Sequence, residues 1–222
     1  TFKSDNKIYR CIDSLPKSLR ILVVENSNNQ NFKKKIESKY LNVECILTGE
    51  NKGYAIANNL GLSKVKTKYS LVLNPDTIIK GNAIEDFLIT ANKNPDFWLL
   101  GPFQGNNDLS KSEKNKRFEV ENLKGFAIFF NMDKFNNNFF DENFFLYFEE
   151  IDLCKKVKKK EGKIFIDPNL IISHDGASSV DLTFKEELEK NRNWHWMWST
   201  FYYHKKYKGF IKAFIIIFPK LI

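Results

Sequence analysis

Short apolar runs alternate with segments of helical pattern along the first hundred residues. The predicted strands are 21–24, 43–47, 69–73 and 97–100, and the predicted helices between them are 31–40, 54–66 and 81–92. Residues 21–24, Ile-Leu-Val-Val, form an unbroken aliphatic run, which is typical of a strand buried on both faces. Strands that alternate with helices favour a parallel, doubly wound arrangement. The sequence therefore predicts an α/β fold with a mostly parallel central sheet flanked by helices.

The net charge indicates which binding partners are favoured, and the cysteine content indicates the redox state of the compartment. The 222 residues carry a formal net charge of +8, which favours a phosphate-bearing substrate, an anionic membrane surface or nucleic acid as partner. The 3 cysteines have no closely spaced pair, so they fit a reducing compartment and support neither a disulfide framework nor a zinc site. No recognised nucleic-acid-binding motif accompanies the charge, so nucleic acid is the least favoured partner.

The chain divides into a main domain and a C-terminal segment. We predict an α/β domain over residues 1–190 and an aromatic, basic helical segment over 191–222. The apolar stretch 210–222 contains Lys212 and is too short to span a bilayer, so it fits either a helix lying on a membrane surface or a terminal core helix. Residues 1–10 are polar and show no signal peptide, so we expect a cytoplasmic protein with peripheral contact to the inner face of the membrane.

Polar residues follow two of the predicted strands. Glu25 and Asn26 follow the run 21–24, and Asn74-Pro75-Asp76 follows the run 69–73. Ligands of doubly wound sheets bind past the carboxyl ends of the strands, so these residues are expected on one rim. Asp76 there is suited to hold a divalent cation that bridges two phosphates, although a side-chain-stabilised turn explains the same residues.

An aromatic run ends in three acids between residues 144 and 154. Glu149, Glu150 and Asp152 follow the sequence Phe-Phe-Leu-Tyr-Phe, and a lysine-rich segment, 155–160, comes next. A carboxylate at the mouth of an aromatic-walled cleft is suited to act as a general base. Acids in a first helical turn and lysines in the last turn also stabilise a helix through its dipole. The segment alone leaves both interpretations open.

In this order along the chain, the motifs resemble the family 2 glycosyltransferases of the GT-A fold, in their rhamnosyltransferase-like branch. The resemblance covers roughly residues 1–180. The matching segments are 23–26, 51–59, 73–77, Gly125, 140–147, 149–153, and His174 with Gly176 and Ser178. Each motif alone is weak evidence for the family, but the occurrence of all of them in register along one chain is specific.

The resemblance implies a donor site and a metal site. The residues that match the family's nucleotide-sugar contacts are Glu25, Asn26, Asn51, Gly53, Asn58, Asn74 and Asp76. Asn74-Pro75-Asp76 matches the metal-binding DxD motif with only the last acid retained, and His174 matches a histidine that completes the metal shell in some relatives. The expected cofactor is a divalent metal, Mg²⁺ or Mn²⁺.

The resemblance also implies a catalytic base. Glu149-Glu150 matches the family's Glu-Asp pair, whose second acid is the base; this assigns the role to Glu150, with Asp152 as the fallback and Glu149 as a capping or orienting residue. One base and a single displacement imply inversion at the anomeric carbon. The expected reaction moves a sugar, with rhamnose among the candidates, from a nucleoside-diphosphate sugar to a hydroxyl of a saccharide or lipid-linked acceptor in cell-surface polysaccharide synthesis.

One departure from the family pattern concerns the sheet. The family opens with an apolar strand, of which only Thr1-Phe2-Lys3 lies near the expected end, so the first strand of the sheet is expected to be missing. Other function classes stay open at this point. They are a degenerate, non-catalytic nucleotide-sugar-binding relative, a sugar nucleotidyltransferase, and a basic nucleic-acid-binding protein.

Overall fold

The computed structural model describes residues 1–103, 117–174 and 185–220. Its helices are α1 (Asp5–Asp13), α2 (Gln30–Lys39), α3 (Gly53–Leu62), α4 (Ala83–Lys93), α5 (Glu149–Lys159), α6 (Lys185–Lys208) and α7 (Phe210–Ile217), with short 3-10 turns at Met132–Lys134 and Phe218–Lys220. Its strands are β1 (Ile21–Glu25), β2 (Val43–Leu47), β3 (Tyr69–Leu73), β4 (Thr77–Ile79), β5 (Phe97–Pro102), β6 (Phe118–Glu119), β7 (Ala127–Asn131), β8 (Lys163–Asp167) and β9 (Ile172–His174). The four runs predicted as strands are confirmed as β1, β2, β3 and β5.

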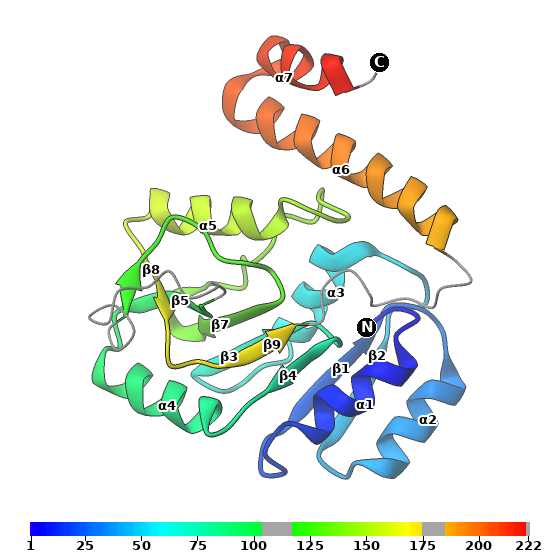
Figure 1. Ribbon diagram of the computed structural model, residues 1–222, viewed down its shortest axis with the longest axis vertical. Coiled ribbons are helices and arrows are strands. Elements are labelled where there is room, and N and C mark those ends of the chain that lie inside the picture. Colours follow the sequence, from blue (N-terminus) through cyan, green and yellow to red (C-terminus); the bar gives the residue numbers. More distant parts are fainter. Residues whose placement is uncertain (104–116, 175–184, 221–222) are drawn as a thin grey trace.

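The strands of the described residues form three separate sheets (Figure 1). The largest has the order β3-β7-β5-β8-β6, a second is the parallel pair β1-β2, and a third is the antiparallel pair β4-β9. Within the largest sheet β7 runs antiparallel to both β3 and β5, whereas β5 and β8 run parallel. The central sheet is therefore mixed, because β7 enters it in the reverse direction between two strands that share a direction.

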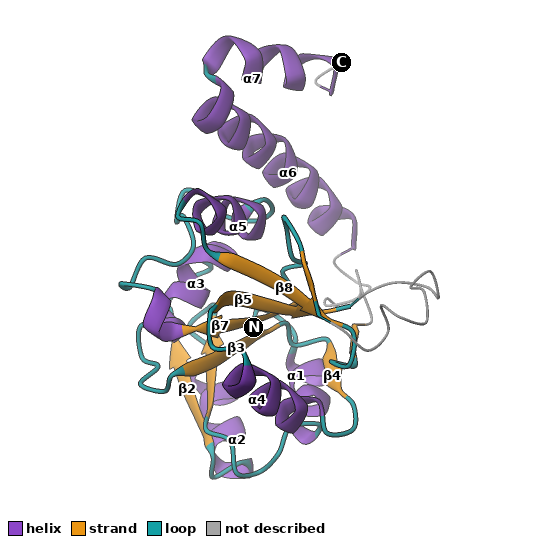
Figure 2. Cartoon of the chain, turned by 90° about the vertical axis from the view of Figure 1, so that its left-hand side faces the viewer, coloured by secondary structure: helices purple, strands orange, loops and turns teal. Residues whose placement is uncertain are grey.

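Helices cover both faces of the main sheet (Figure 2). On one face α4 covers the main sheet, and the ring of Phe87 stacks on that of Phe129 with centroids 3.6 Å apart. On the other face α3 and α5 pack through residues such as Ala55 and Leu153. A third cluster joins β1 and β2 to α1 and α2. Layers of helix, sheet and helix give the α/β architecture that the alternation predicts.

The two C-terminal helices extend away from the sheets, with α6 passing beside α5 and α7 at the far end (Figure 1). The predicted division between residues 190 and 191 falls inside α6, which is one continuous helix. Among the described residues, no helix is both long enough and apolar enough to cross a bilayer.

Candidate functional site

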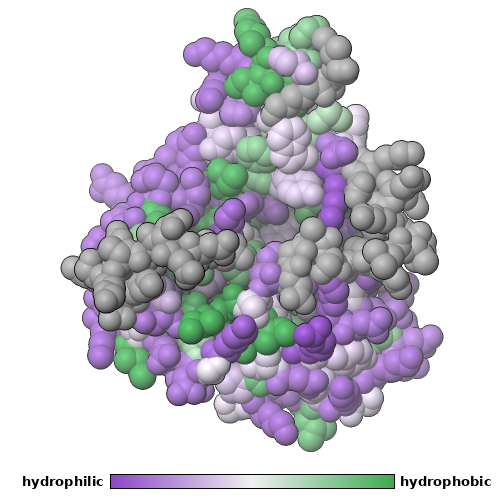
Figure 3. All heavy atoms as spheres, in the orientation of Figure 1, coloured by the Kyte–Doolittle hydropathy of each residue, from purple (hydrophilic) through white to green (hydrophobic). Residues whose placement is uncertain are grey.

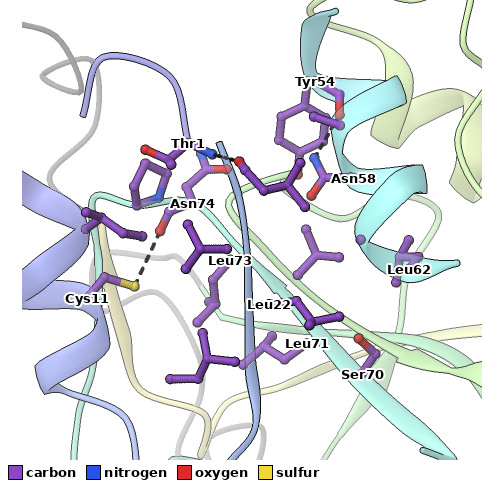
Figure 4. A pocket seen from close by; sticks show the side chains of 18 of the residues that line it. Thr1, Cys11, Leu22, Tyr54, Asn58, Leu62, Ser70, Leu71, Leu73 and Asn74 are labelled. Carbon is purple, nitrogen blue, oxygen red and sulfur yellow. Dashed lines mark hydrogen bonds between the residues drawn. The ribbon is translucent and has the colours of Figure 1, made fainter. Parts of the chain in front are cut away.

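The carboxyl ends of β1 and β3 open onto one cavity of about 1350 Å³. Asn26 follows β1 and Asn74 follows β3, and both line the cavity together with Asn58 of α3 (Figure 4). The topology that the sequence predicts therefore does bring these polar residues to one rim. His174 and Asp76 line the same cavity. Figure 4 shows Asn58 and Asn74 at the upper end of the cavity, and Leu22 and Leu71 between the strands below them.

Asp76 and His174 meet at this rim because β4 pairs with β9. The register of that pairing places Thr77 opposite His174, and the Nε2 atom of His174 lies 3.3 Å from Oδ1 of Asp76. Asp76 is buried, and its Oδ1 atom makes no hydrogen bond. The ring of Phe126 stacks on His174 with centroids 4.7 Å apart, which fixes the imidazole plane.

This pair offers one oxygen and one nitrogen donor to a cation. The described residues contain no group of three or more His, Cys, Asp or Glu side chains that could hold a metal ion. A buried carboxylate oxygen without a hydrogen bond, beside an imidazole nitrogen, nevertheless fits a divalent ion that takes its other ligands from a bound phosphate and from water. Asp76 and His174 therefore fit as part of the ligand set of a Mg²⁺ or Mn²⁺ ion.

Asn26 and Asn51 hold a loop in place with their side chains. The amide of Asn26 donates to Oδ1 of Asn51 at 2.9 Å and to the carbonyl of Gly53 at 3.0 Å, while its oxygen accepts from the backbone N–H of Lys52. Oδ1 of Asn51 also accepts from the N–H of Gly53. These bonds shape the entry into α3, so both residues have a structural role in addition to lining the cavity.

Gly53 is required where α3 begins. Its φ of +82° is in the left-handed region, and a Cβ atom there would lie 2.4 Å from the carbonyl oxygen of Phe145. That carbonyl accepts from the N–H of Tyr54 at 2.7 Å. The start of α3 is thus tied to the aromatic segment that precedes the acids. Asn58, one turn later, donates to the carbonyl of Tyr54.

Glu25, predicted to contact the nucleoside, is buried at the end of β1. The hydroxyl of Ser27 donates to its Oε1 atom at 2.7 Å, and its Oε2 atom makes no hydrogen bond. Burial raises the pKa of Glu25, and the bond from Ser27 acts in the opposite direction. The positive charge of the Thr1 amino group also acts to lower the pKa of Glu25.

Glu149 and Glu150 begin α5 behind an unusual turn. Tyr147 and Phe148 both have positive φ values, +72° and +68°, a conformation that L residues rarely adopt. Burial, and secondly the neighbouring Glu150, raise the pKa of Glu149 to about 8. Burial also raises the pKa of Glu150, whose side chain is less enclosed. Strained backbone that presents carboxylates with raised pKa values is typical of a functional site.

Contacts join these acids to the Asp76–His174 pair. A Cβ atom built on Gly125 would be 3.7 Å from the Glu150 side chain, and the next residue, Phe126, stacks on His174. The hydroxyl of Tyr54 donates to the carbonyl of Gly125 at 2.6 Å. Burial, followed by the charges of Glu149 and Glu150, raises the pKa of Tyr54 well above its ordinary value. Segment 125–126 therefore lies between the acids and the rim.

Asp152 has a different environment. Its side chain is fully buried, and its Oδ1 atom accepts from the ammonium of Lys206 and from the hydroxyl of Tyr207, each at 2.7 Å. Lys206 also bonds Asp141 at 2.6 Å. Burial alone would raise the pKa of Asp141, but the bonds from Lys206 and Asn143 outweigh it and lower that pKa to about 2. Asp152 is thus directed toward α6.

Sequence reasoning missed several residues of the cavity. Tyr147, Arg192 and His195 line it, and the ring of His195 stacks on Phe145 with centroids 4.2 Å apart. No local pattern places His195 at the rim, because its position depends on the docking of α6. Gly176 and Ser178 lie outside the described residues.

Comparisons with known proteins agree with this geometry. The profile described as "Glycosyl transferase family 2" matches residues 1–154. The low-salt glycan biosynthesis hexosyltransferase Agl10 of Haloferax volcanii is 22% identical over 191 residues, which cover 73% of this chain and 61% of that protein. The chain thus spans less than two thirds of the length of this curated relative.

Solved glycosyltransferase structures share the fold. The mannosyltransferase PcManGT of Pyrobaculum calidifontis, solved with GDP-Man and Mn²⁺, has a TM-score of 0.66 at 12% identity over 98% of this chain and 67% of that one. GalNAc-T7 with UDP, GalNAc and Mn²⁺ has a TM-score of 0.64 at 14% identity over 92% of this chain and 47% of that one. TarS 1–349 of S. aureus has a TM-score of 0.60 at 16% identity over 78% of this chain and 57% of that one. These neighbours identify the fold as GT-A.

Proposed function

Because this chain belongs to glycosyl transferase family 2, we propose that it transfers a hexosyl group from a nucleoside-diphosphate sugar to a hydroxyl acceptor, with inversion at the anomeric carbon. The observation that carries the proposal is the chain of contacts from Glu150 through Gly125 and Phe126 to the Asp76–His174 pair. In this arrangement the Glu150 carboxylate, whose pKa is raised, lies on one side of segment 125–126, and the proposed diphosphate-binding rim lies on the other side.

The rim binds the donor in this proposal. Asn58 and Asn74 line the cavity beside Asp76 and present side-chain amides and a carboxylate to a nucleotide. A divalent cation held by Asp76 and His174 would neutralise the charge that develops on the departing diphosphate. Two of the structural neighbours carry Mn²⁺ in their structures, which supports this choice of cation.

Glu150 is the proposed base. The acceptor oxygen forms a bond to the anomeric carbon, the bond from that carbon to the diphosphate breaks with its electron pair, and Glu150 takes the proton of the acceptor hydroxyl. A positioned base contributes about 100- to 10,000-fold in rate. Burial raises the pKa of Glu150 toward neutral pH, which favours its action as a proton acceptor. Glu149, which is more deeply buried, holds the turn, and Asp152 anchors α6.

The acceptor is proposed to be a saccharide or lipid-linked saccharide of the cell surface, with rhamnose among the candidate sugars. The C-terminal helices support a location at an anionic membrane. Phe210, Ile211, Phe214 and Ile215 of α7 are between 47% and 75% exposed, and apolar residues gather over α7 at the top of Figure 3. Lys208 and Lys212 stand among them and suit contact with anionic head groups.

Calorimetry tests the donor site. UDP, GDP and dTDP are titrated in turn, with and without Mn²⁺, into the wild-type chain, Asp76→Ala and the control Asp133→Ala, an exposed acid outside the rim. We expect Mn²⁺ to strengthen binding of at least one nucleotide about tenfold or more, and Asp76→Ala to remove that gain while Asp133→Ala keeps it. An undiminished Mn²⁺ effect in Asp76→Ala would exclude Asp76 from the site.

A degenerate relative that binds nucleotide sugars without turnover is the second candidate. It is favoured by the loss of the first DxD acid, which here is Asn74. Donor binding without measurable transfer or donor hydrolysis would identify it.

A further inference from the structure

Positive and negative charges are unequally divided in the wall of the cavity. Among the described residues that line it, Asp76 is the one acid. The lysines and arginines in the same wall are Lys3, Arg20, Lys64, Lys66, Lys68 and Arg192. An excess of positive charge in a hollow with apolar walls raises the local concentration of anions. The cavity is therefore suited to an anionic ligand.

Arg192 reaches this cavity from α6, on the face of that helix that docks onto the α/β domain. The residues of α6 that make the docking contacts are His195, Ser199, Tyr202 and Lys206. Positions three and four apart lie on the same side of a helix, and Arg192 precedes His195 by three. The docked face of α6 therefore directs Arg192 into the cavity wall.

The guanidinium of Arg192 is half-buried and has no counter-ion among the described residues, with which it makes no hydrogen bond or ion pair. Lys206, on the same face of α6, is instead bonded by the carboxylates of Asp141 and Asp152. A guanidinium presents parallel N–H groups that match the oxygens of a phosphate group. Arg192 is thus a cation that is available to a ligand of the cavity.

The residues around Arg192 also belong to the site. Tyr147 is in the strained turn before α5, and burial raises its pKa while the charge of Arg192 acts in the opposite direction. His195 stacks on Phe145, and burial lowers its pKa, so the imidazole is mainly neutral at pH 7. Of the three described α6 residues in the cavity wall, Asn191, Arg192 and His195, Arg192 therefore supplies the positive charge.

We propose that Arg192 binds a phosphate group of the ligand that enters this cavity. The inference rests on the proposed transferase function, which offers two sources of phosphate. One is the diphosphate of the donor, and the other is the phosphate of a lipid-linked acceptor. Arg192 holds the ligand in place and takes no part in proton transfer, which the proposed function assigns to Glu150.

Calorimetry with two kinds of phosphate probe tests this proposal. UDP, GDP and dTDP represent the donor, and decyl phosphate, kept below the concentration at which it forms micelles, represents the lipid-linked acceptor. The variants are Arg192→Gln, Arg192→Lys and the control Lys205→Gln, at an exposed lysine of the same helix. We expect Arg192→Gln to weaken binding of at least one probe about tenfold or more, Arg192→Lys to weaken it less, and the control to bind as wild type does.

The two probes distinguish the source of the phosphate. A loss of affinity confined to the nucleotides would identify the donor diphosphate as the group that Arg192 binds, and a loss confined to decyl phosphate would identify the lipid phosphate. The loss for a nucleotide should be the same with and without Mn²⁺, which separates it from the effect of Asp76→Ala. If wild type bound no nucleotide, the proposed donor site would be wrong, and decyl phosphate would still decide the role of Arg192.

Three outcomes would overturn the proposal. The first is unchanged affinity of Arg192→Gln for both kinds of probe. The second is a wild-type chain that binds neither kind. The third is an equal loss of affinity for the tightest-binding nucleotide and for its nucleoside, which lacks phosphate, because that result would show that Arg192 acts through the position of α6.

Discussion

At the scale of single residues, the most informative feature is a pair of adjacent glutamates with little access to water. Glu149 is 5% exposed and its Oε2 atom makes no hydrogen bond. Two neighbouring carboxylates in an apolar site resist carrying two charges, so one proton is retained near neutral pH. A site of this kind keeps one acid neutral and leaves the other available as a base.

The pKa of Glu149 predicts how stability depends on pH. Its folded-state value of about 8 lies above the ordinary 4.5, so its contribution is fully present below pH 4.5 and is lost as pH rises toward 8. We expect ionisation of Glu149 to lower the free energy of unfolding by about 1.4 kcal/mol per pH unit between pH 5 and 8. Other titrating groups add their own contributions to the pH dependence. Urea unfolding at pH 5.5, 6.5 and 7.5 measures this slope.

Substitution isolates the contribution of this one group. Glu149→Gln should flatten the slope, because the amide cannot ionise, whereas Glu50→Gln at an exposed acid should leave it unchanged. An identical slope in wild type and Glu149→Gln would mean that another group is responsible.

The polar residues of the rim show what sequence can predict at this scale. The motifs located Asn26, Asn51 and Gly53, and these residues do meet at one place. Their hydrogen bonds were not predictable, because Asn26 bonds a residue 25 positions away through a loop whose shape depends on Gly53 and Phe145. The bond between Asp152, the fallback base, and Lys206 was not predictable either, because the two residues are 54 positions apart.

At the scale of elements, α6 matters because it is tied to the helix that carries the acids. Lys206 bonds Asp141 and Asp152, the hydroxyl of Ser199 donates to the carbonyl of Leu146 at 2.7 Å, and the ring of Tyr202 packs edge-on against Phe144. The contacts cover the segment leading to Glu149. The position of α6 therefore influences the shape of the site.

Removing one charge tests this attachment. Lys206→Met keeps the aliphatic stem but leaves buried Asp152 with only the more distant ammonium of Lys156, 3.8 Å away. We therefore expect the free energy of unfolding to fall by about 1–2 kcal/mol, less than for a fully buried pair, because Lys206 is partly exposed. Lys205→Met, at an exposed neighbouring lysine, is the matched control. Equal unfolding midpoints for the two variants would show that the ion pairs do not hold α6.

The exposed face of α7 gives a separate prediction. We expect the chain to co-sediment with vesicles containing phosphatidylglycerol, and to bind less as salt increases, because apolar residues enter the interface while lysines meet the head groups. The double variant Ile211→Ser, Ile215→Ser should bind at least tenfold less. Leu41→Ser, which alters an exposed leucine elsewhere, should bind as wild type does. Equal sedimentation of the two variants would argue against a membrane role for α7.

At the scale of the whole molecule, the alternation of strands and helices was enough to predict the α/β class. Runs of buried aliphatic residues locate β1, β2, β3 and β5. The GT-A fold was implied by the resemblance of the motifs, and the solved neighbours confirm it. The reversed strand β7 was not predicted, although all five of its residues are buried, because its direction is set by distant pairing with β3 and β5.

Single-turnover sugar transfer by Glu150→Gln tests most directly whether Glu150 is the catalytic base. The donor is taken from a panel of UDP-, GDP- and dTDP-sugars, and the acceptor is a lipid-linked saccharide. We predict that Glu150→Gln keeps the donor Kd within about twofold of wild type but transfers sugar about 100-fold more slowly or worse, the scale of a lost general base, while Asp152→Asn loses much less. Near wild-type transfer by Glu150→Gln, together with an inactive Asp152→Asn, would contradict the account and assign the base to Asp152.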